Sequence, residues 1–209
     1  MAINEQSEFW KGEFGDEYTK RCSGDLDTYY KNQYGVTKTE LNREFFKGIP
    51  KTSAILECGC NHGWQLKLLK KEGFQSLWGF EINRSALLLA QEDKDLNLVE
   101  GSILDVPFKD GFFDLVFTNG VLIHIHPSDL PKAMDEMYRM SKRYILCLEY
   151  YSDKLEEIVY RGNTNKLWKD NFLKLFLERF PKLKLVKERK LKYINEPDKT
   201  DNIFLMEKK

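Results

Sequence analysis

The chain has 209 residues, which is enough for one α/β domain with a full core but short for two domains. Lysine plus arginine and aspartate plus glutamate total 33 each, so the formal net charge is zero and no overall field attracts nucleic acid or an anionic membrane. The sequence shows no signal-peptide pattern, no apolar run near the roughly 18 residues of a membrane helix, and no C-x-x-C motif among its four cysteines. We therefore expect a cytoplasmic protein with reduced thiols.

An aromatic and charged segment comes first. Its aromatic residues recur at helical spacing with glycines between them, which predicts an amphipathic helix broken near both glycines. The aromatics are Phe9, Trp10, Phe14 and Tyr18, and the glycines are Gly12 and Gly15. Such a segment either packs on a sheet or closes over a ligand as a lid. We predict a helical lid or extension over residues 1–50, with a helix near Lys38–Lys47 capped by Thr37 or Thr39, and a single compact ligand-binding domain over residues 51–209.

The most informative stretch is Ala54–Gly63, which reads A-I-L-E-C-G-C-N-H-G. Its apolar start predicts a strand buried on both faces, which ends at Glu57. Residues that tolerate a left-handed backbone follow at alternate positions, namely Gly59, Asn61 and Gly63. A helix is expected next, over Trp64–Glu72. Strand, tight turn and helix together predict the nucleotide-binding opening of a doubly wound α/β sheet.

The turn does not fit the two common phosphate-binding patterns. Asn61 and Trp64 stand where a dinucleotide fingerprint needs glycines, and no Lys-Ser or Lys-Thr pair follows Gly63. An acidic residue followed by small residues at alternate positions is instead the E/D-x-G-x-G-x-G pattern that binds S-adenosylmethionine (SAM), with one glycine replaced by Asn61. A plain strand–helix turn is the alternative interpretation of this degenerate loop.

The next strand, predicted over Leu77–Ile82, carries a carboxylate near its end. Glu81 lies about 20 residues beyond the glycine turn, where an acidic residue accepts hydrogen bonds from both ribose hydroxyls. Asn83 is expected to cap the following helix. A third strand, Leu96–Val99, leads into a loop that borders the adenine in this fold. There Ser102 offers polar groups, and Ile103 or Leu104 offers an apolar face.

The second half of the chain continues the alternation of strands and helices. A fourth strand runs into Thr118–Pro127, a loop at the sheet edge where ligands bind in this class of fold. The expected elements are strands over Phe112–Phe117 and Tyr144–Tyr151, a helix capped by Ser128, a helix from Asn171 to Phe180 capped by Asp170, and an antiparallel pair of strands over Leu183–Tyr193 and Asn202–Glu207. The lysines of Leu183–Tyr193 alternate with apolar residues, which favours a solvated strand face over a basic binding patch.

Four stretches look like the successive motifs of class I SAM-dependent methyltransferases: Glu57–Gly63, Gly79–Glu81 (G-F-E), Gly101–Asp105 (G-S-I-L-D) and Phe113–His124 (F-D-L-V-F-T-N-G-V-L-I-H). Others resemble, more narrowly, the pseudaminic acid biosynthesis-associated methylase family, namely Phe9–Tyr18, Gly120–Pro127, Arg143–Tyr151, Tyr160–Gly162 and Phe180–Val186. The resemblance spans nearly the whole chain. It departs from the family at Cys22, where Asn is usual, and around Gly162–Asn165.

The resemblance implies a Rossmann-like, seven-stranded, mostly parallel α/β sheet with one antiparallel strand near the C-terminus, and SAM as the cofactor. The cofactor-binding residues would be Glu57, Gly59, Cys60, Asn61 and Gly63 near the methionine tail and ribose, Glu81 and Ile82 at the ribose, Ser102 and Ile103 at the adenine, and Asn119, Gly120 and Val121 near the sulfonium. We also expect the aromatic segment to close over SAM, because aromatic faces attract the sulfonium cation. Trp10, Tyr18 and Arg21 would take part, with Arg21 on the methionine carboxylate and Tyr18 near the methyl group.

The sulfonium methyl group is already activated, so most of the catalysis can come from positioning. A general base matters only for a hydroxyl or protonated amine acceptor. The candidate bases are His124, which leads, Tyr18 and Tyr150, followed by His126, Glu149 and Tyr151. A core role for His124 stays open. No metal site is expected, because C-x-C at Cys58 and Cys60 is poor zinc spacing.

These features predict a SAM-dependent methyltransferase that acts on a small polar metabolite, such as a nonulosonic-acid-type sugar or its nucleotide-linked precursor. Two alternatives remain: a methyltransferase for protein or peptide side chains, and a SAM-binding regulatory subunit without turnover. The neutral charge argues against a nucleic-acid or membrane partner. The sequence does not reveal the acceptor atom or the oligomeric state.

Overall fold

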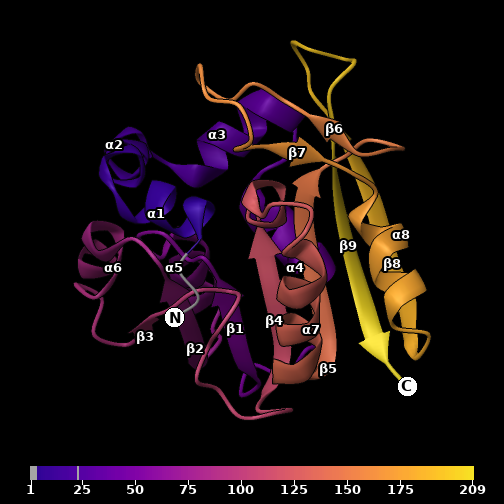
Figure 1. The fold of residues 1–209 in the computed structure, drawn as a ribbon. Helices are drawn as coiled ribbons and strands as arrows, with labels where there is room; N and C mark the ends of the chain where they lie inside the picture. The colour runs from indigo at the N-terminus through magenta and orange to yellow at the C-terminus, as the bar shows by residue number, and fades with distance from the viewer. Residues whose placement is uncertain (1–3, 23) are drawn as a thin grey trace. The chain divides into compact units, whose positions relative to one another are not determined.

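The computed structural model describes residues 4–22 and 24–209 (Figure 1). Its seven-stranded sheet has the strand order β3-β2-β1-β4-β5-β9-β8. The chain divides into two compact units, Met1–Asp105 and Val106–Lys209. Each unit contributes consecutive strands of that order together with flanking helices.

The first unit holds three parallel strands. They are β1 (Ala54–Cys58), β2 (Ser76–Glu81) and β3 (Asn97–Glu100), and the helices are α1 (Glu5–Lys11), α2 (Glu13–Arg21), α3 (Leu26–Tyr34), α4 (Lys38–Phe45), α5 (Trp64–Lys71) and α6 (Arg84–Ala90). The first strand extends past Glu57, which was expected to end it, to Cys58. Because the three strands are parallel, their carboxyl ends meet at one edge, where the glycine turn and Glu81 lie.

The N-terminal helices break once rather than twice. Gly12 ends α1 and begins α2, whereas Gly15 lies inside α2. A Cβ built on Gly15 would stand 1.9 Å from the Trp10 carbonyl oxygen and 2.7 Å from Asn83 Nδ2. The prediction of a break at Gly15 was therefore wrong, because this glycine permits close packing instead of interrupting the helix. Thr37 caps α4 in a capping box with Glu40, as one of the two expected caps.

The second unit holds the other four strands and a small hairpin. The strands are β4 (Phe113–Asn119), β5 (Ser141–Tyr150), β8 (Leu183–Lys192) and β9 (Thr200–Lys208), the hairpin is β6 (Glu156–Glu157) with β7 (Trp168–Lys169), and the helices are η1 (Leu122–His124), α7 (Leu130–Met140) and α8 (Phe172–Arg179). Strand β5 runs parallel to β4, and β9 runs antiparallel to both β5 and β8. The predicted mostly parallel sheet with an antiparallel strand near the C-terminus is confirmed.

Two predicted helix caps were wrong for local reasons. The Asp170 side chain accepts a hydrogen bond from the Asn171 N–H, and Asn171 takes the cap position and accepts from the Lys174 N–H. Ser128 does not cap α7, because its N–H and hydroxyl both engage His126 Nδ1 in a tight turn, and Asp129 occupies the cap position.

Strand β8 is an edge strand whose residues are mostly exposed on both faces. Leu185 and Val186 are 43% and 50% exposed, and the register against β9 shifts between Leu185 and Lys187. Across residues 4–22 and 24–209, none of the helices has the length and apolar character needed to cross a membrane.

A Gly79→Ala variant is expected to unfold at a lower temperature than the wild type. The added Cβ would stand 2.8 Å from Cys60 Sγ and 2.9 Å from Leu66 Cδ1, so the strand and the glycine turn would be forced apart. Overpacking of this kind costs about 1–3 kcal/mol of unfolding free energy. Calorimetry would measure the difference in melting temperature between Gly79→Ala and the wild type. Equal melting temperatures for Gly79→Ala and wild type would contradict the packing argument.

Candidate functional site

The glycine turn after β1 has the left-handed backbone that its residue types predict. The φ angles of Gly59, Asn61 and Gly63 are 67°, 47° and 77°. The Cys60 N–H donates to the Phe80 carbonyl at 3.0 Å and the Gly63 N–H donates to the Cys60 carbonyl at 2.8 Å, which closes the turn against β2. Asparagine tolerates a positive φ better than most other non-glycine residues, which explains why Asn61 can stand between the two glycines of this turn. The turn is thus ordered against β2 at the carboxyl edge of the sheet, with Gly59 and Asn61 partly exposed.

Glu81 lies at the end of β2 and is held by three backbone N–H donors. One oxygen, Oε1, accepts from Ile82 and Asn83 at 2.8 Å each, and Oε2 accepts from Asn61 at 2.8 Å. The side chain is buried, and burial raises the pKa of this carboxyl, while its backbone donors act in the opposite direction. Glu81 therefore joins the glycine turn to the start of α6, so two of the regions predicted to bind the cofactor are brought together.

Two further buried polar groups flank the turn. Within the described residues, Glu57 Oε2 and Gln65 Oε1 are buried oxygens without a hydrogen-bond partner. Burial raises the pKa of Glu57 well above its usual value, and the charge of Lys38 opposes that rise. Lys38 is itself buried, its Nζ lies 5.2 Å from the Tyr30 ring centroid, and burial lowers its pKa to about 8. Two buried acceptors without a partner beside the turn fit a ligand that carries an ammonium group, such as an amino acid tail.

The N-terminal helices place Trp10, Tyr18 and Arg21 in one aromatic cluster. The Trp10 ring meets those of Phe9, Phe14 and Tyr18 edge-on, with centroids 5.4–5.7 Å apart. The Arg21 guanidinium carbon lies 5.5 Å from the Phe14 centroid, and its NH1 lies 3.8 Å from Glu17. Arg21 is thus oriented by its own helix, and its role at a methionine carboxylate stays a prediction.

The predicted adenine-side residues lie in the loop after β3. Ser102 and Ile103 are both buried. Ser102 forms an isolated bridge with Asp105, and its hydroxyl accepts from the Leu104 N–H at 3.3 Å. The loop is therefore ordered by its own backbone and side chains, which gives Ser102 and Ile103 defined positions.

In the second unit, Glu149 organises the loop after β4 that contains Asn119, Gly120 and Val121. The Gly120 N–H donates to the Leu148 carbonyl at 2.8 Å, and the backbone of Val121 and Ile123 donates to the two Glu149 oxygens at 3.2 and 3.4 Å. The carboxyl of Glu149 is only 1% exposed, and this burial raises its pKa to about 7. The Glu149 carboxyl accepts from these backbone donors and so holds the loop in place, and its role as a base stays a prediction.

His124 lies in η1, next to the small hairpin. Its Nδ1 is 2.8 Å from the Lys166 carbonyl oxygen, so Nδ1 carries the proton and Nε2 is the acceptor. Burial lowers the pKa of this imidazole to about 4, so the ring is neutral at pH 7. The Tyr160 ring lies 5.1 Å away, centroid to centroid. The neutral imidazole carries its proton on Nδ1 and has an acceptor at Nε2, but the burial that lowers its pKa also makes it a weak base at pH 7.

The remaining candidate bases differ in their surroundings. Tyr150 ends β5, pairs with Asp201 of β9, and is half-buried. His126 binds Ser128 and meets the Trp168 ring edge-on, which favours a structural role. Tyr151 bonds to Asp153 through its hydroxyl, and this bond raises its pKa to about 12. Among the described residues, no three His, Cys, Asp or Glu side chains gather as they would around a metal ion.

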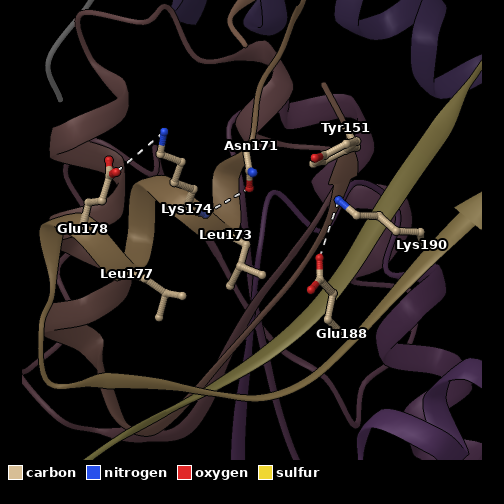
Figure 2. A pocket seen from close by; sticks show the side chains of 8 residues that line it. All are labelled: Tyr151, Asn171, Leu173, Lys174, Leu177, Glu178, Glu188 and Lys190. Atoms are coloured by element: carbon tan, nitrogen blue, oxygen red, sulfur yellow. Dashed lines mark hydrogen bonds and ion pairs between the residues drawn. The ribbon is translucent and has the colours of Figure 1, made fainter. Parts of the chain in front are cut away.

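A shallow depression of about 430 Å³ lies beside α8 and β8 in the second unit (Figure 2). Leu173 and Leu177 form its apolar part, and charged side chains surround them. The lining residues are Tyr151, Asn171, Leu173, Lys174, Leu177, Glu178, Glu188 and Lys190. Of the predicted site residues, only Tyr151 contributes to it.

A family model described as a methyltransferase domain matches residues 56–144, from β1 to the start of β5. The matched stretch includes the glycine turn, Glu81, the loop after β3 and the loop that contains His124. The chain has the fold of a class I SAM-dependent methyltransferase. SAM is the cofactor that this domain and this fold imply, and the unpartnered Glu57 oxygen and the Glu81 carboxylate fit its ammonium and ribose hydroxyl groups.

Solved structures agree on the fold. The chain is similar to 1,6-didemethyltoxoflavin-N1-methyltransferase from Burkholderia thailandensis, solved with 1,6-didemethyltoxoflavin and S-adenosylhomocysteine, with a TM-score of 0.73, 12% identity and coverage of 100% of this chain and 92% of that chain. A SAM-dependent methyltransferase from Leishmania major matches with a TM-score of 0.72, 17% identity and coverage of 98% and 87%. A complex from Haloferax volcanii between a methyltransferase activator and a methyltransferase matches with a TM-score of 0.72, 12% identity and coverage of 98% and 97%.

The sequence did not reveal every residue that surrounds the candidate site. Lys38 and Gln65 carry no motif, and only burial next to Glu57 or the turn draws attention to them. Asn83 was expected as a helix cap and is one, but its contacts with the N-terminal helices are long-range. In the sequence, the one sign that Asn83 contributes to the site was its position shortly after Glu81, at the end of the second predicted strand.

Proposed function

We propose that this protein transfers a methyl group from SAM to a small polar metabolite, with a nonulosonic-acid-type sugar or its nucleotide-linked precursor as the acceptor to test first. The observation that carries the proposal is the match of a methyltransferase domain to a stretch whose glycine turn, Glu57 and Glu81 fit SAM. The small acceptor is supported by the zero net charge, which offers no field for nucleic acid. The narrower family resemblance of the sequence supports the sugar.

The protein's contribution to this reaction is binding, orientation and proton removal. SAM, when bound, supplies an electrophilic methyl group. Glu81 binds the ribose hydroxyls, Glu57 balances the ammonium of the methionine tail, and Ser102 and Ile103 contact the adenine. In this proposal Asn119, Gly120 and Val121 lie near the sulfonium, and Trp10, Tyr18 and Arg21 close the cofactor side.

His124 is the proposed base. Its Nδ1 proton is held by the Lys166 carbonyl, so Nε2 takes the proton from a hydroxyl or ammonium acceptor. General-base catalysis is worth about 10²–10⁴-fold in rate when the pKa of the base is near the operating pH, and the low pKa of His124 places its contribution at the lower end of that range. Tyr18 and Tyr150 are the alternative groups for proton removal or for orienting the acceptor.

A protein or peptide acceptor is the second candidate function. One comparison, the structurally similar complex from Haloferax volcanii, contains a methyltransferase together with a protein, although that protein is an activator and not a methyl acceptor. In this alternative the small β6–β7 hairpin and the exposed apolar residues Leu155 and Val159 beside it would meet a polypeptide. A SAM-binding subunit without turnover is the third candidate.

One assay separates these functions. The protein is incubated with methyl-labelled SAM and with separate small-molecule and protein fractions of a cell extract, and labelled products are counted. Label in the small-molecule fraction is the expected result, lost in His124→Gln but retained in His126→Gln, whose imidazole binds Ser128 instead. Label confined to the protein fraction would favour the second function. Binding of S-adenosylhomocysteine without label in either fraction would favour the third.

A further inference from the structure

The side chain of Asn83 is engaged on three sides. Its Oδ1 accepts from the Ala86 N–H at 2.9 Å, which caps α6. Its Nδ2 donates to the Trp10 carbonyl at 3.1 Å and to Asp16 Oδ1 at 3.0 Å. The residue is 3% exposed. One amide group therefore joins α6 to both N-terminal helices.

The backbone of Asn83 also contacts the carboxylate of Glu81, which is the group proposed to bind the cofactor ribose. The Asn83 N–H donates to Glu81 Oε1 at 2.8 Å, and the other oxygen of Glu81 accepts from the Asn61 N–H. An unbroken series of hydrogen bonds thus runs from Asp16 through Asn83 and Glu81 to the glycine turn. A rigid support of this kind is what keeps a binding group in its productive orientation.

Gly15 shows that the N-terminal helices are built to lie here. Any side chain at this position would collide with the Trp10 carbonyl oxygen and with Asn83 Nδ2, the two atoms that the junction brings together. Asp16, the next residue, also bonds Ser85, and its contacts with Asn83 and Ser85 lower the pKa of its carboxyl. The charge at the junction is therefore present at pH 7.

We propose that Asn83 is a positioning residue through which the docking of α1 and α2 orients Glu81 for the cofactor ribose. The N-terminal helices then serve as a fixed support of the cofactor site, in addition to any closure over the ligand. The inference rests on the proposed function only in that SAM or S-adenosylhomocysteine must bind at Glu81.

Asn83→Asp separates this role from the helix cap. Aspartate is an equally good N-cap, so α6 keeps its bond to Ala86. However, the introduced carboxylate offers no donor to the Trp10 carbonyl and faces the carboxylate of Asp16. Binding of S-adenosylhomocysteine should weaken by at least about fivefold, because a like-charge contact replaces a charge-assisted hydrogen bond. Adding Asp16→Asn removes the like-charge contact and reverses donor and acceptor in that one hydrogen bond, so the double variant should recover part of the affinity, while the Trp10 carbonyl still lacks its donor.

The controls distinguish an oriented ribose from general damage. Glu13→Gln removes one negative charge from the same first turn of α2, on an exposed residue, and should bind like the wild type. Adenosine, which retains the ribose and lacks the methionine tail, should lose affinity in Asn83→Asp by the same factor as S-adenosylhomocysteine. The melting temperature of each variant is recorded alongside. If Asn83→Asp does not fold, Asp16→Ala is used, with an expected loss of about threefold or more against Glu13→Ala.

A folded Asn83→Asp variant that binds S-adenosylhomocysteine with wild-type affinity overturns the inference. A double variant that shows no recovery of affinity also overturns it. Where Asp16→Ala is used instead of Asn83→Asp, wild-type affinity of Asp16→Ala overturns it. Loss of S-adenosylhomocysteine affinity with adenosine binding unchanged also overturns it, because the ribose would then be unaffected. A failure of the proposed function looks different. In that case the wild-type protein itself does not bind S-adenosylhomocysteine or does not transfer methyl groups.

Discussion

Replacing Glu81 with alanine is expected to weaken the binding of SAM and S-adenosylhomocysteine by about 1.5–3 kcal/mol, or roughly 10–150-fold in Kd. The Glu81 carboxylate is expected to accept hydrogen bonds from both ribose hydroxyls. Hydrogen bonds to a charged group contribute a binding free energy of this size. The variant also releases three backbone donors that now bind Glu81, so the glycine turn loses its link to α6. The measurement is calorimetric titration with S-adenosylhomocysteine.

A matched control is available on the neighbouring strand. Glu100 stands directly opposite Glu81 in the β2–β3 register, but it is exposed. Glu100→Ala should bind the ligand as the wild type does. Equal affinities for Glu81→Ala and wild type, with both proteins folded, would mean that the ribose is held by other groups.

The free energy of unfolding should depend on pH through two buried groups, Glu149 and His124, whose contributions change in opposite directions as the pH rises. Burial raises the pKa of Glu149 from 4.5 to about 7, so between these values the folded protein binds a proton that the unfolded chain has released. Its contribution is fully present below pH 4.5 and is lost as the pH rises through 7, a loss of about 3 kcal/mol in unfolding free energy. A Glu149→Gln variant removes this loss.

His124 acts in the other direction. Burial lowers its pKa from 6.5 to about 4, so between these values the unfolded chain binds the proton. Its contribution is present above pH 6.5 and is lost as the pH falls through 4. Part of the residue's surface remains exposed, so this contribution is at most about 3 kcal/mol. Because the two windows overlap, the effects oppose each other between pH 4.5 and 6.5.

Urea denaturation from pH 4 to 8 would measure both contributions. Relative to the wild type, Glu149→Gln should become progressively more stable as the pH rises from 4.5 to 7, and His124→Gln should become progressively less stable as the pH rises from 4 to 6.5. Differences from the wild type are compared because other buried groups, such as Glu57 and Lys38, titrate in every variant. Curves that run parallel to that of the wild type would show that neither group is perturbed by burial.

What the sequence could predict was local. The glycine turn and Glu81 were recognised because residue type and spacing within about 25 positions carry the signal. Asn83 was recognised as a cap for the same reason, yet its bonds to Trp10 and Asp16 span 73 and 67 residues, and no local pattern records them. Such contacts follow from how helices pack on a sheet rather than from any segment by itself.

The misinterpreted elements have similar physical explanations. Gly15 was taken as a second break in the helix because glycine occurs both where a helix is interrupted and where two segments pack closely. Only the Trp10 carbonyl beside Gly15 shows that close packing is the reason here. The hairpin of β6 and β7 was missed because each strand has two residues, too few to show alternation. For His124 in the second unit, the structure adds the tautomer and the neutral charge of the imidazole. A sequence motif records neither of them.

The lysine-rich strand β8 has a consequence for how copies of this protein behave in concentrated solution. A chain with no net charge lacks the long-range repulsion that keeps molecules dispersed, and an exposed edge strand with Leu185 and Val186 invites pairing with another copy. The ammonium groups of Lys184, Lys187 and Lys192 place like charges along that edge, whereas Lys190 is paired with Glu188. Colloidal stability therefore depends on repulsion along one strand, and light scattering should show association when salt screens it.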